Sequence, residues 1–261
     1  MDAANAKEAA SLLLTAYRSR KPISALPEAL RPRNISEGYQ IQEAVVGLAG
    51  QKAIGWKIGC TSEHAQELLH VDAPFAGRVL ANAVLSSPAR IKDGTVTMGI
   101  AEAEFAFVLA RDLPSRPRGY AIEEVIEAIG ELRPAIELPD SRFIDWQSVG
   151  APQLIADNGV AAMLVLGAPA LNWQAKALRG HGVTVSVNGA TVAEGSGANV
   201  LGDPCRALTW LTNEMSKSGI GLKAGEVVST GSCADIVRIS PGDRIVADFG
   251  PIGRVEVVLA A

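Results

Sequence analysis

Two glutamates separated by one residue stand in an otherwise apolar segment, AEAEFAFVL, at residues 101–109. This composition predicts a β-strand, in which alternate residues share a face. Glu102 and Glu104 would then lie side by side on a face that continues with Ala106 and Val108. Because both faces are apolar, we expect both carboxylates to be buried. Buried neighbouring carboxylates repel each other and lose hydration, so they need a shared proton, a cationic partner or a metal ion.

Two further charged residues stand in similar apolar surroundings. Glu137 lies within PAIELP and Lys57 within IGWKIG. Three carboxylates and one ammonium leave an excess of two negative charges, which one divalent cation would neutralise. Oxygen-only ligands favour Mg²⁺ or Mn²⁺ over zinc. The residues alone leave other interpretations open, since a single E-x-E pair is weak evidence and Lys57 is equally typical of a surface lysine whose stem covers apolar neighbours.

Other common catalytic chemistries lack their sequence motifs. There is no H-E-x-x-H, no Cys/His cluster, no G-x-x-x-x-G-K-[ST], no G-x-G-x-x-G and no G-x-S-x-G. The histidines (His64, His70, His181) are scattered, and the three cysteines form no C-x-x-C pair. We therefore expect carboxylates and lysine to carry the chemistry, and the cysteines to be small buried residues in a reducing compartment.

The overall composition is that of a globular protein. The chain has 261 residues, 24 basic and 28 acidic, with a net charge of −4, which gives no sign of a nucleic-acid-binding surface. No apolar run is long enough to span a membrane, and the N-terminus lacks a signal-peptide pattern. We expect a cytoplasmic protein without a membrane or nucleic-acid partner.

Helices are expected over the first 50 residues, strands and helices in the middle of the chain, and mainly strands after about residue 160. Helices are predicted over much of residues 1–50, from Asn5 with Glu8 as a capping box and again at 36–48, then at 121–131, and from Asp203 to Gly219. Strands are predicted at 101–109, 160–166, 226–230, 243–248 and 253–259, with a hairpin over 183–195 that turns at Asn188-Gly189. Strands and helices do not alternate strictly, so the pattern favours an α+β fold with a rolled or barrel-like sheet.

Several motifs together resemble those of one enzyme group. GWKIGCTS at 55–62 is similar to the G-x-K-x-G-x-T-S segment of bacterial 2-oxopent-4-enoate (2-hydroxypentadienoate) hydratases, and residues 102–114 to their E-x-E-x-x-x-V-L-x-R-D-L-P strand. Further similar segments follow in the same order at 134–137, 141–146, 156–158, 201–204, 229–231 and 241–243. The chain thus resembles the fumarylacetoacetate hydrolase superfamily, in its 2-oxopent-4-enoate hydratase and 4-oxalocrotonate decarboxylase branch.

This resemblance implies an architecture. It implies an N-terminal helical region over residues 1–75 and a mixed β-roll catalytic domain over 76–261. It also implies assembly into homo-oligomers and, as in related decarboxylases and hydratases, association with a sister pathway enzyme.

The resemblance also implies roles for particular residues. Mg²⁺ or Mn²⁺ would be held by the three glutamates Glu102, Glu104 and Glu137. Lys57 would be a general acid/base beside the substrate's C2 oxygen, with its pKa lowered by apolar neighbours. Thr230 and the backbone of Gly231 would hold the substrate carboxylate, and Asn158 would line the pocket. Arg78, which is not part of the family pattern, would bind a distal carboxylate or else be a surface arginine.

Two departures from the hydratase pattern leave the reaction open. Phe75 replaces an acid in V-D-x-P-D-F-G, and Val160 replaces the serine of A-D-N-A-S. The leading hypothesis is hydration of a 2-hydroxy-2,4-dienoate to a 4-hydroxy-2-oxo acid in aromatic-compound catabolism. The alternatives are decarboxylation of a 4-oxalocrotonate-type acid, C–C hydrolysis of an acylpyruvate, and a non-catalytic accessory subunit.

Overall fold

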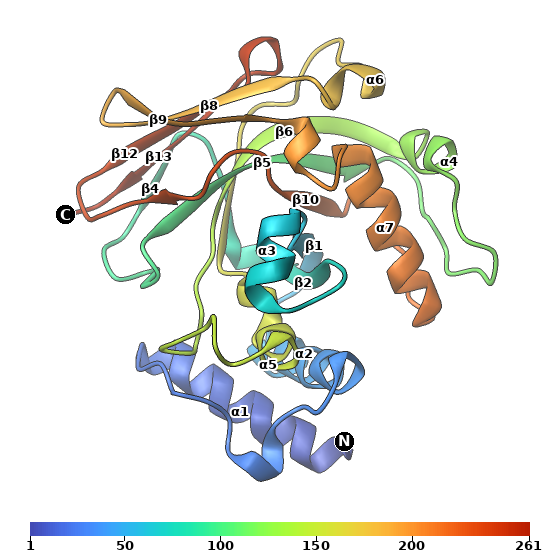
Figure 1. Cartoon of the computed structure of the whole chain (residues 1–261), viewed down its shortest axis with the longest axis vertical. Coiled ribbons are helices and arrows are strands. Elements are labelled where there is room, and N and C mark those ends of the chain that lie inside the picture. The colour runs from blue at the N-terminus through green and yellow to red at the C-terminus, as the bar shows by residue number, and fades with distance from the viewer.

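The computed structural model describes the whole chain, residues 1–261, as a group of helices packed against two β-sheets. In Figure 1 the N-terminal helices α1 (Ala3–Ser19) and α2 (Ile35–Ala49) lie together with α5 (Ala151–Ala156) at one end, and the strands fill the other. The remaining helices are α3 (Glu63–Leu69), α4 (Ile122–Ile126), α6 (Ala175–Leu178) and α7 (Pro204–Lys217). None of these helices is long and apolar enough to cross a membrane.

The N-terminal helices have their own apolar core, which includes a later part of the chain. A cluster of 11 buried residues joins α1 and α2 to Phe143 and Ala156. Helix α1 begins earlier than predicted, because the side chain of Asp2 accepts the Asn5 N–H and caps it there. The predicted capping box at Asn5 and Glu8 is therefore wrong.

The larger sheet contains eight strands and carries the predicted chemistry. Its order is β2-β1-β10-β5-β6-β7-β3, with β11 pairing to β5. The strands are β1 (Ala53–Gly59), β2 (Phe75–Leu80), β3 (Val84–Ser86), β5 (Ile100–Leu109), β6 (Ile129–Leu138), β7 (Met163–Leu166), β10 (Val227–Ser232) and β11 (Val237–Arg238). β10 is inserted between β1 and β5, parallel to β1 and antiparallel to β5.

The smaller sheet has five strands in the order β4-β13-β12-β8-β9. These are β4 (Ala89–Ile91), β8 (Gly182–Val187), β9 (Ala190–Ser196), β12 (Arg244–Asp248) and β13 (Arg254–Leu259). The predicted hairpin is confirmed, because β8 and β9 pair across Asn188 and Gly189, both with positive φ. A cluster of 41 buried residues, the main core, joins the two sheets and α7.

Some predicted elements differ from the observed ones. The helical stripe at 121–131 ends at Ile126, because Ile129 begins β6 and pairs with Leu109. β1 and β2 were not predicted as strands. β1 lies before the predicted domain boundary at residues 75/76, yet it belongs to the larger sheet. The domain boundary stays a prediction. The homo-oligomer, the association with a sister enzyme and the cytoplasmic location also stay predictions.

Candidate metal centre and adjoining cavity

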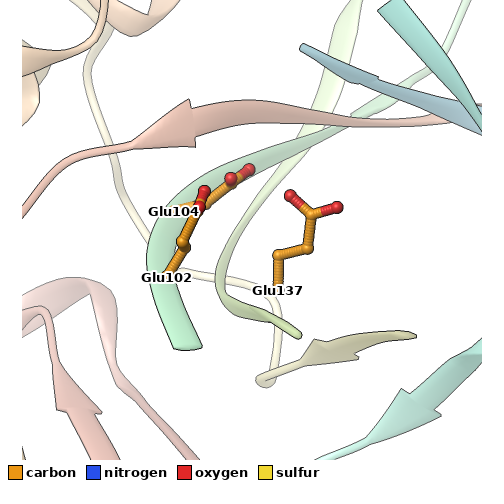
Figure 2. A group of neighbouring side chains, drawn as sticks. All are labelled: Glu102, Glu104 and Glu137. Carbon is orange, nitrogen blue, oxygen red and sulfur yellow. The ribbon is translucent and has the colours of Figure 1, made fainter. Parts of the chain in front are cut away.

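The three glutamates meet because of the register between β5 and β6. Glu102 lies directly opposite Glu137, and Glu104 follows two residues later on the same face. Figure 2 shows the three side chains converging, and one carboxylate oxygen from each lies within 4.8 Å of the others. Strand pairing thus brings together carboxylates that are 35 residues apart in the sequence.

Two of these carboxylates are buried with unsatisfied oxygens, and the third, Glu102, is half-buried. Glu104 and Glu137 are almost fully buried, and Oε1 of Glu104 has no hydrogen-bond partner. Burial, with repulsion from Glu137, raises the pKa of Glu102 to about 7. Burial, with repulsion from both neighbours, raises the pKa of Glu104 well above its usual value. An orphaned buried oxygen among carboxylates that repel one another indicates surroundings that suit a cation.

The second oxygen of Glu104 is held by β10. Its Oε2 accepts a hydrogen bond from the Ser229 hydroxyl and another, at 3.0 Å, from the Gly231 N–H. Ser229 lies beside Lys57 of β1 and beside Ala106 of β5, so one sheet face carries all these groups. This arrangement fixes one oxygen of Glu104 and leaves the other free for a ligand.

Lys57 is the cation of this cluster. It is buried, and its Nζ lies 3.4 Å from Oε2 of Glu137. Burial acts to lower the pKa of Lys57, but the charges of Glu137, Glu102 and Glu104 outweigh burial and raise it. The predicted lowering of this pKa is therefore wrong for the metal-free protein, because three carboxylates rather than apolar neighbours dominate.

These residues fit Mg²⁺ or Mn²⁺. All the offered ligand atoms are carboxylate oxygens, which hard divalent cations prefer. After pairing with Lys57 the cluster has an excess of two negative charges, and the orphaned Oε1 of Glu104 would gain a partner. Glu102, Glu104 and Glu137 are thus the residues that would hold the ion.

A cavity of about 980 Å³ adjoins this cluster. Lys57, Glu102 and Gly231 line it together with a largely apolar surface that includes Phe75 and Val160. Phe75 and Val160, the two departures from the hydratase motif, therefore both line this cavity, which is called the larger cavity. Its size is ample for a small organic acid.

The sequence comparison with protein families agrees with this geometry. A family model described as fumarylacetoacetate (FAA) hydrolase C-terminal matches residues 58–260. The chain belongs to the fumarylacetoacetate hydrolase family. The resemblance seen in the sequence motifs and the α+β fold are both confirmed.

Relatives within the fumarylacetoacetate hydrolase family include hydratases. The chain is 32% identical over 254 residues to a 2-keto-4-pentenoate hydratase of Paraburkholderia xenovorans, covering 96% of this chain and 93% of the relative. It is 31% identical over 237 residues to a 2-hydroxyhexa-2,4-dienoate hydratase of Comamonas testosteroni, covering 89% of each. A solved structure of 4-oxalocrotonate decarboxylase from Pseudomonas putida G7, complexed with magnesium and adipate, superimposes with a TM-score of 0.89 at 22% identity, covering 99% of this chain and 98% of that one.

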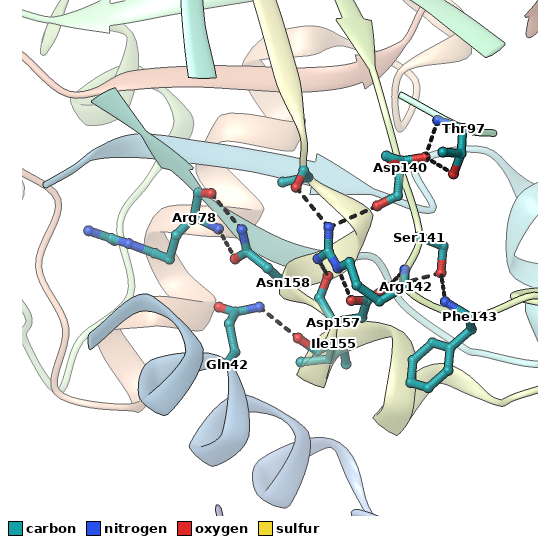
Figure 3. A network of polar contacts seen from close by, with 11 residues as sticks. Gln42, Arg78, Thr97, Asp140, Ser141, Arg142, Phe143, Ile155, Asp157 and Asn158 are labelled. Carbon is teal, nitrogen blue, oxygen red and sulfur yellow. Dashed lines mark hydrogen bonds and ion pairs between the residues drawn. The ribbon is translucent and has the colours of Figure 1, made fainter. Parts of the chain in front are cut away.

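Asn158 and Arg78 do not line the larger cavity but lie on another side of Lys57. Figure 3 shows the Asn158 side chain bound to the backbone of Arg78, accepting its N–H at 2.8 Å and donating to its carbonyl at 2.9 Å. The Arg78 guanidinium stacks 3.7 Å from the Trp56 ring and lies 3.5 Å from Glu226. Both residues line a smaller cavity of about 200 Å³, which reaches Lys57 from the side of the N-terminal helices.

Thr230 lies on the opposite face of β10 from the glutamates. Its buried hydroxyl donates to the carbonyl of Phe105 at 2.8 Å. Gly231 does face the cluster, but its N–H is donated to Glu104. Ser229, which also contacts Glu104, was not identified from the sequence. Alternate residues of a strand share a face, so Ser229 and Gly231 face the glutamates and Thr230 faces away. This alternation could have identified Ser229 from the sequence.

A second buried charge cluster holds the segment before η3, the 3₁₀ turn Asn158–Val160. Asp157 is fully buried and accepts from Ser141, from the Arg142 N–H and from the Arg142 guanidinium, as Figure 3 shows. Arg142 also donates to the carbonyls of Asp157 and Asp140. Burial raises the pKa of Asp157 to about 6 against the opposing charge of Arg142, so the pair is ionised at neutral pH.

Val160 is held in an unusual backbone conformation at the end of this segment. Its φ is +57°, after +55° at Asn158 and +59° at Gly159. A β-branched residue in the left-handed region costs about 1–3 kcal/mol. The hydrogen bonds of Asn158 to Arg78 and of the Asp140 N–H to the Val160 carbonyl at 2.9 Å hold this turn in place.

Proposed function

We propose that this protein is a Mg²⁺- or Mn²⁺-dependent hydratase that converts a 2-hydroxy-2,4-dienoate to a 4-hydroxy-2-oxo acid in aromatic-compound catabolism. The observation that carries the proposal is the convergence of Glu102, Glu104 and Glu137 beside a buried Lys57 at one end of a large cavity. The hydratases at 31–32% identity over most of the chain support this reaction class.

The proposed reaction has two stages. In the first, the proton of the 2-hydroxyl leaves, C2=O and C3=C4 double bonds form, and C5 gains a proton. In the second, the oxygen of water bonds to C4 and C3 gains a proton, which gives the 4-hydroxy-2-oxo acid. When bound, a divalent cation supplies Lewis-acid polarisation of the 2-oxo head.

Lys57 is positioned to move the proton at the substrate's C2 oxygen. Its ammonium lies in the carboxylate cluster and its raised pKa keeps it protonated in the metal-free protein. A divalent cation held by Glu102, Glu104 and Glu137 would offset the charges that raise this pKa. The neutral Nζ of Lys57 would accept the 2-hydroxyl proton, and the ammonium would return a proton when negative charge forms on that oxygen during water addition.

The test follows the ultraviolet absorbance of 2-hydroxypenta-2,4-dienoate, 4-oxalocrotonate and an acylpyruvate with Mg²⁺, with Mn²⁺ and after chelation. We expect metal-dependent loss of the dienoate with formation of 4-hydroxy-2-oxopentanoate. Lys57→Met should lower kcat by about 10²–10⁴-fold while Mn²⁺ still binds, because the ligands remain. Turnover of only 4-oxalocrotonate or the acylpyruvate would replace hydration by decarboxylation or C–C hydrolysis, and no turnover of any of them would overturn an enzymatic role.

A further inference from the structure

The wall of the larger cavity next to Lys57 is built by an aromatic ring. β1 and β2 pair so that Lys57 lies opposite Gly77 and Gly59 lies opposite Phe75. Lys57 and Phe75 are therefore diagonal neighbours on one face, close enough for a long side chain and an aromatic ring to meet. Gly59 leaves its space to the ring, since a methyl group at Gly59 would lie 3.0 Å from Cε2 of Phe75. A substrate whose head lies at Lys57 would thus direct its tail along this ring.

The ring belongs to an apolar cluster that is separate from the main core. Five buried residues form it: Leu69, Phe75, Leu154, Ile155 and Val160. All of them except Ile155 line the larger cavity, together with the half-buried Trp146. Helix α3, β2, α5 and η3 each contribute at least one of these side chains. The cavity surface beyond the carboxylate cluster is therefore hydrocarbon on several sides.

The basic residues that line this cavity lie outside the apolar cluster. Lys57 is paired with Glu137 within the carboxylate cluster. The other basic residues that line the cavity, His64 and Arg206, are exposed, and so are the acidic residues Glu63 and Asp235 beside them. A second carboxylate buried against the apolar cluster would lose its hydration without gaining a cationic partner, which is strongly unfavourable.

We infer that this cavity selects 2-oxo and 2-hydroxy-2,4-dienoic acids whose far end carries a hydrocarbon group and rejects those with a second carboxylate. Phe75 and Val160 are the specificity-determining residues, because each places an apolar group where the hydratase motif has a polar one. The inference rests on the proposed function for the position of the substrate head at Lys57. It concerns only what the tail contacts.

The backbone makes this wall resistant to rearrangement. Val160 is the third of three consecutive residues with positive φ, and the Asn158 side chain fixes the turn to β2 through both of its hydrogen bonds to Arg78. A methyl group at Gly77 would lie 2.2 Å from the Asn158 carbonyl, so η3 packs directly on the strand. The part of the apolar wall that Val160 contributes is thus held against β2.

The experiment measures binding of non-reacting acids to the Mn²⁺-loaded protein by calorimetry. The three ligands are pyruvate, which has only the head, 2-oxohexanoate, and 2-oxohexanedioate, which has the same chain length with a terminal carboxylate. We expect 2-oxohexanoate to bind more tightly than pyruvate by up to about fourfold per buried methylene. We expect 2-oxohexanedioate to bind at least about 30-fold more weakly than 2-oxohexanoate.

Variants then assign the selectivity to the named residues. Val160→Thr keeps the shape and the β-branch and adds one hydroxyl, so it should reduce the ratio of the two affinities several-fold. Phe75→Ala should reduce the gain from the alkyl tail and leave pyruvate binding unchanged. The matched control is Val149→Thr, the same substitution at a residue that packs against the apolar cluster without lining the larger cavity. It should leave the ratio unchanged.

The outcomes separate this inference from the proposed function. Pyruvate binding with equal or tighter binding of 2-oxohexanedioate would overturn the selectivity and leave the head site intact. An unchanged ratio in both Val160→Thr and Phe75→Ala would overturn the assignment to these residues. Failure of all three acids to bind would overturn the head site and the inference together. Selective binding without metal-dependent turnover of any dienoate would overturn hydration and support the inference.

Discussion

The two buried charge clusters of this protein differ in how completely their polar atoms are satisfied. Around Asp157, the hydroxyl of Ser141 and the backbone and guanidinium of Arg142 all donate, and the guanidinium also reaches two carbonyls. In the glutamate cluster, Oε1 of Glu104 has no partner and Oε2 of Glu137 meets only Lys57. The first cluster is complete as folded, whereas the second leaves buried carboxylate oxygens without a hydrogen-bond partner. Burial of charge alone therefore does not mark a site, but incomplete pairing does.

Breaking the completed cluster should have the largest effect on stability. Asp157→Asn leaves the Arg142 charge buried without its partner, which should lower the free energy of unfolding by about 3–5 kcal/mol. Denaturant unfolding checks this, and Mn²⁺ affinity measured where the variant is folded should stay within about threefold. Asp248→Asn is the control, because Asp248 pairs with the exposed Arg254 and should cost less than about 1 kcal/mol. Equal losses in both variants would contradict the comparison.

Removing a charge from the incomplete cluster should affect metal binding instead. Glu104→Gln should weaken Mn²⁺ binding at least about 100-fold, since a ligand is lost as well as a charge. The metal-free variant should melt no lower than the wild type, because a carboxylate that repels its neighbours is gone. Calorimetry and thermal melts measure the two effects. Glu131→Gln, on the neighbouring strand β6 and paired with the half-exposed Arg133, should leave Mn²⁺ affinity unchanged. Undiminished turnover in Glu104→Gln would rule out the site.

Changing pH should separate the metal-free and metal-loaded states. The pKa of Glu102 is raised to about 7 and that of Glu104 is also raised, so the folded metal-free protein binds protons that the unfolded chain releases near pH 4.5. This contribution to stability is complete below about pH 4.5 and is lost as pH rises through about 7. Mn²⁺ must displace these protons, so its affinity should rise about tenfold or more between pH 6 and 8. The Mn²⁺-induced increase in Tm should grow over the same range, and a constant increase would contradict the assignment.

The smallest expected effects come from neighbouring residues on β10. Ser229→Ala removes a hydrogen bond that orients Glu104, and Mn²⁺ affinity should fall about threefold to tenfold. Thr230→Val removes a hydrogen bond to Phe105 on the other face and should lower stability by about 1 kcal/mol without changing Mn²⁺ affinity. Measuring both quantities for both variants checks the assignment of faces. If Thr230→Val lost more Mn²⁺ or pyruvate affinity than Ser229→Ala, Thr230 would instead have the predicted role of holding the substrate carboxylate.

The fold class and the three glutamates could be predicted from the sequence because they depend on local patterns and on motifs. Alternation placed Glu102 and Glu104 on one face, and Asn188-Gly189 and Asp203-Pro204 located a turn and a helix start that the structure confirms. The convergence of Glu137 with Glu102 depends on the register of two strands, which the residues of either strand alone do not determine.

What the sequence did not reveal lies in contacts between distant segments. The rise in the pKa of Lys57 depends on three carboxylates from other strands. The engagement of the Asn158 side chain with the backbone of Arg78 depends on η3 crossing β2. β1 was missed because IGWKIG contains a charge and two glycines, which obscure a strand that lies within the larger sheet.

The position of β10 in the larger sheet has a consequence for biosynthesis. β1 and β5 are made early, yet β10, made more than a hundred residues later, lies between them. Lys57 on β1 and the glutamates on β5 therefore cannot reach their final separation until residues 227–232 have left the ribosome. A chain truncated before Val227 should neither retain Mn²⁺ nor hold β1 in place. Acquisition of the ion by the nascent protein would then report that the last part of the sheet has closed.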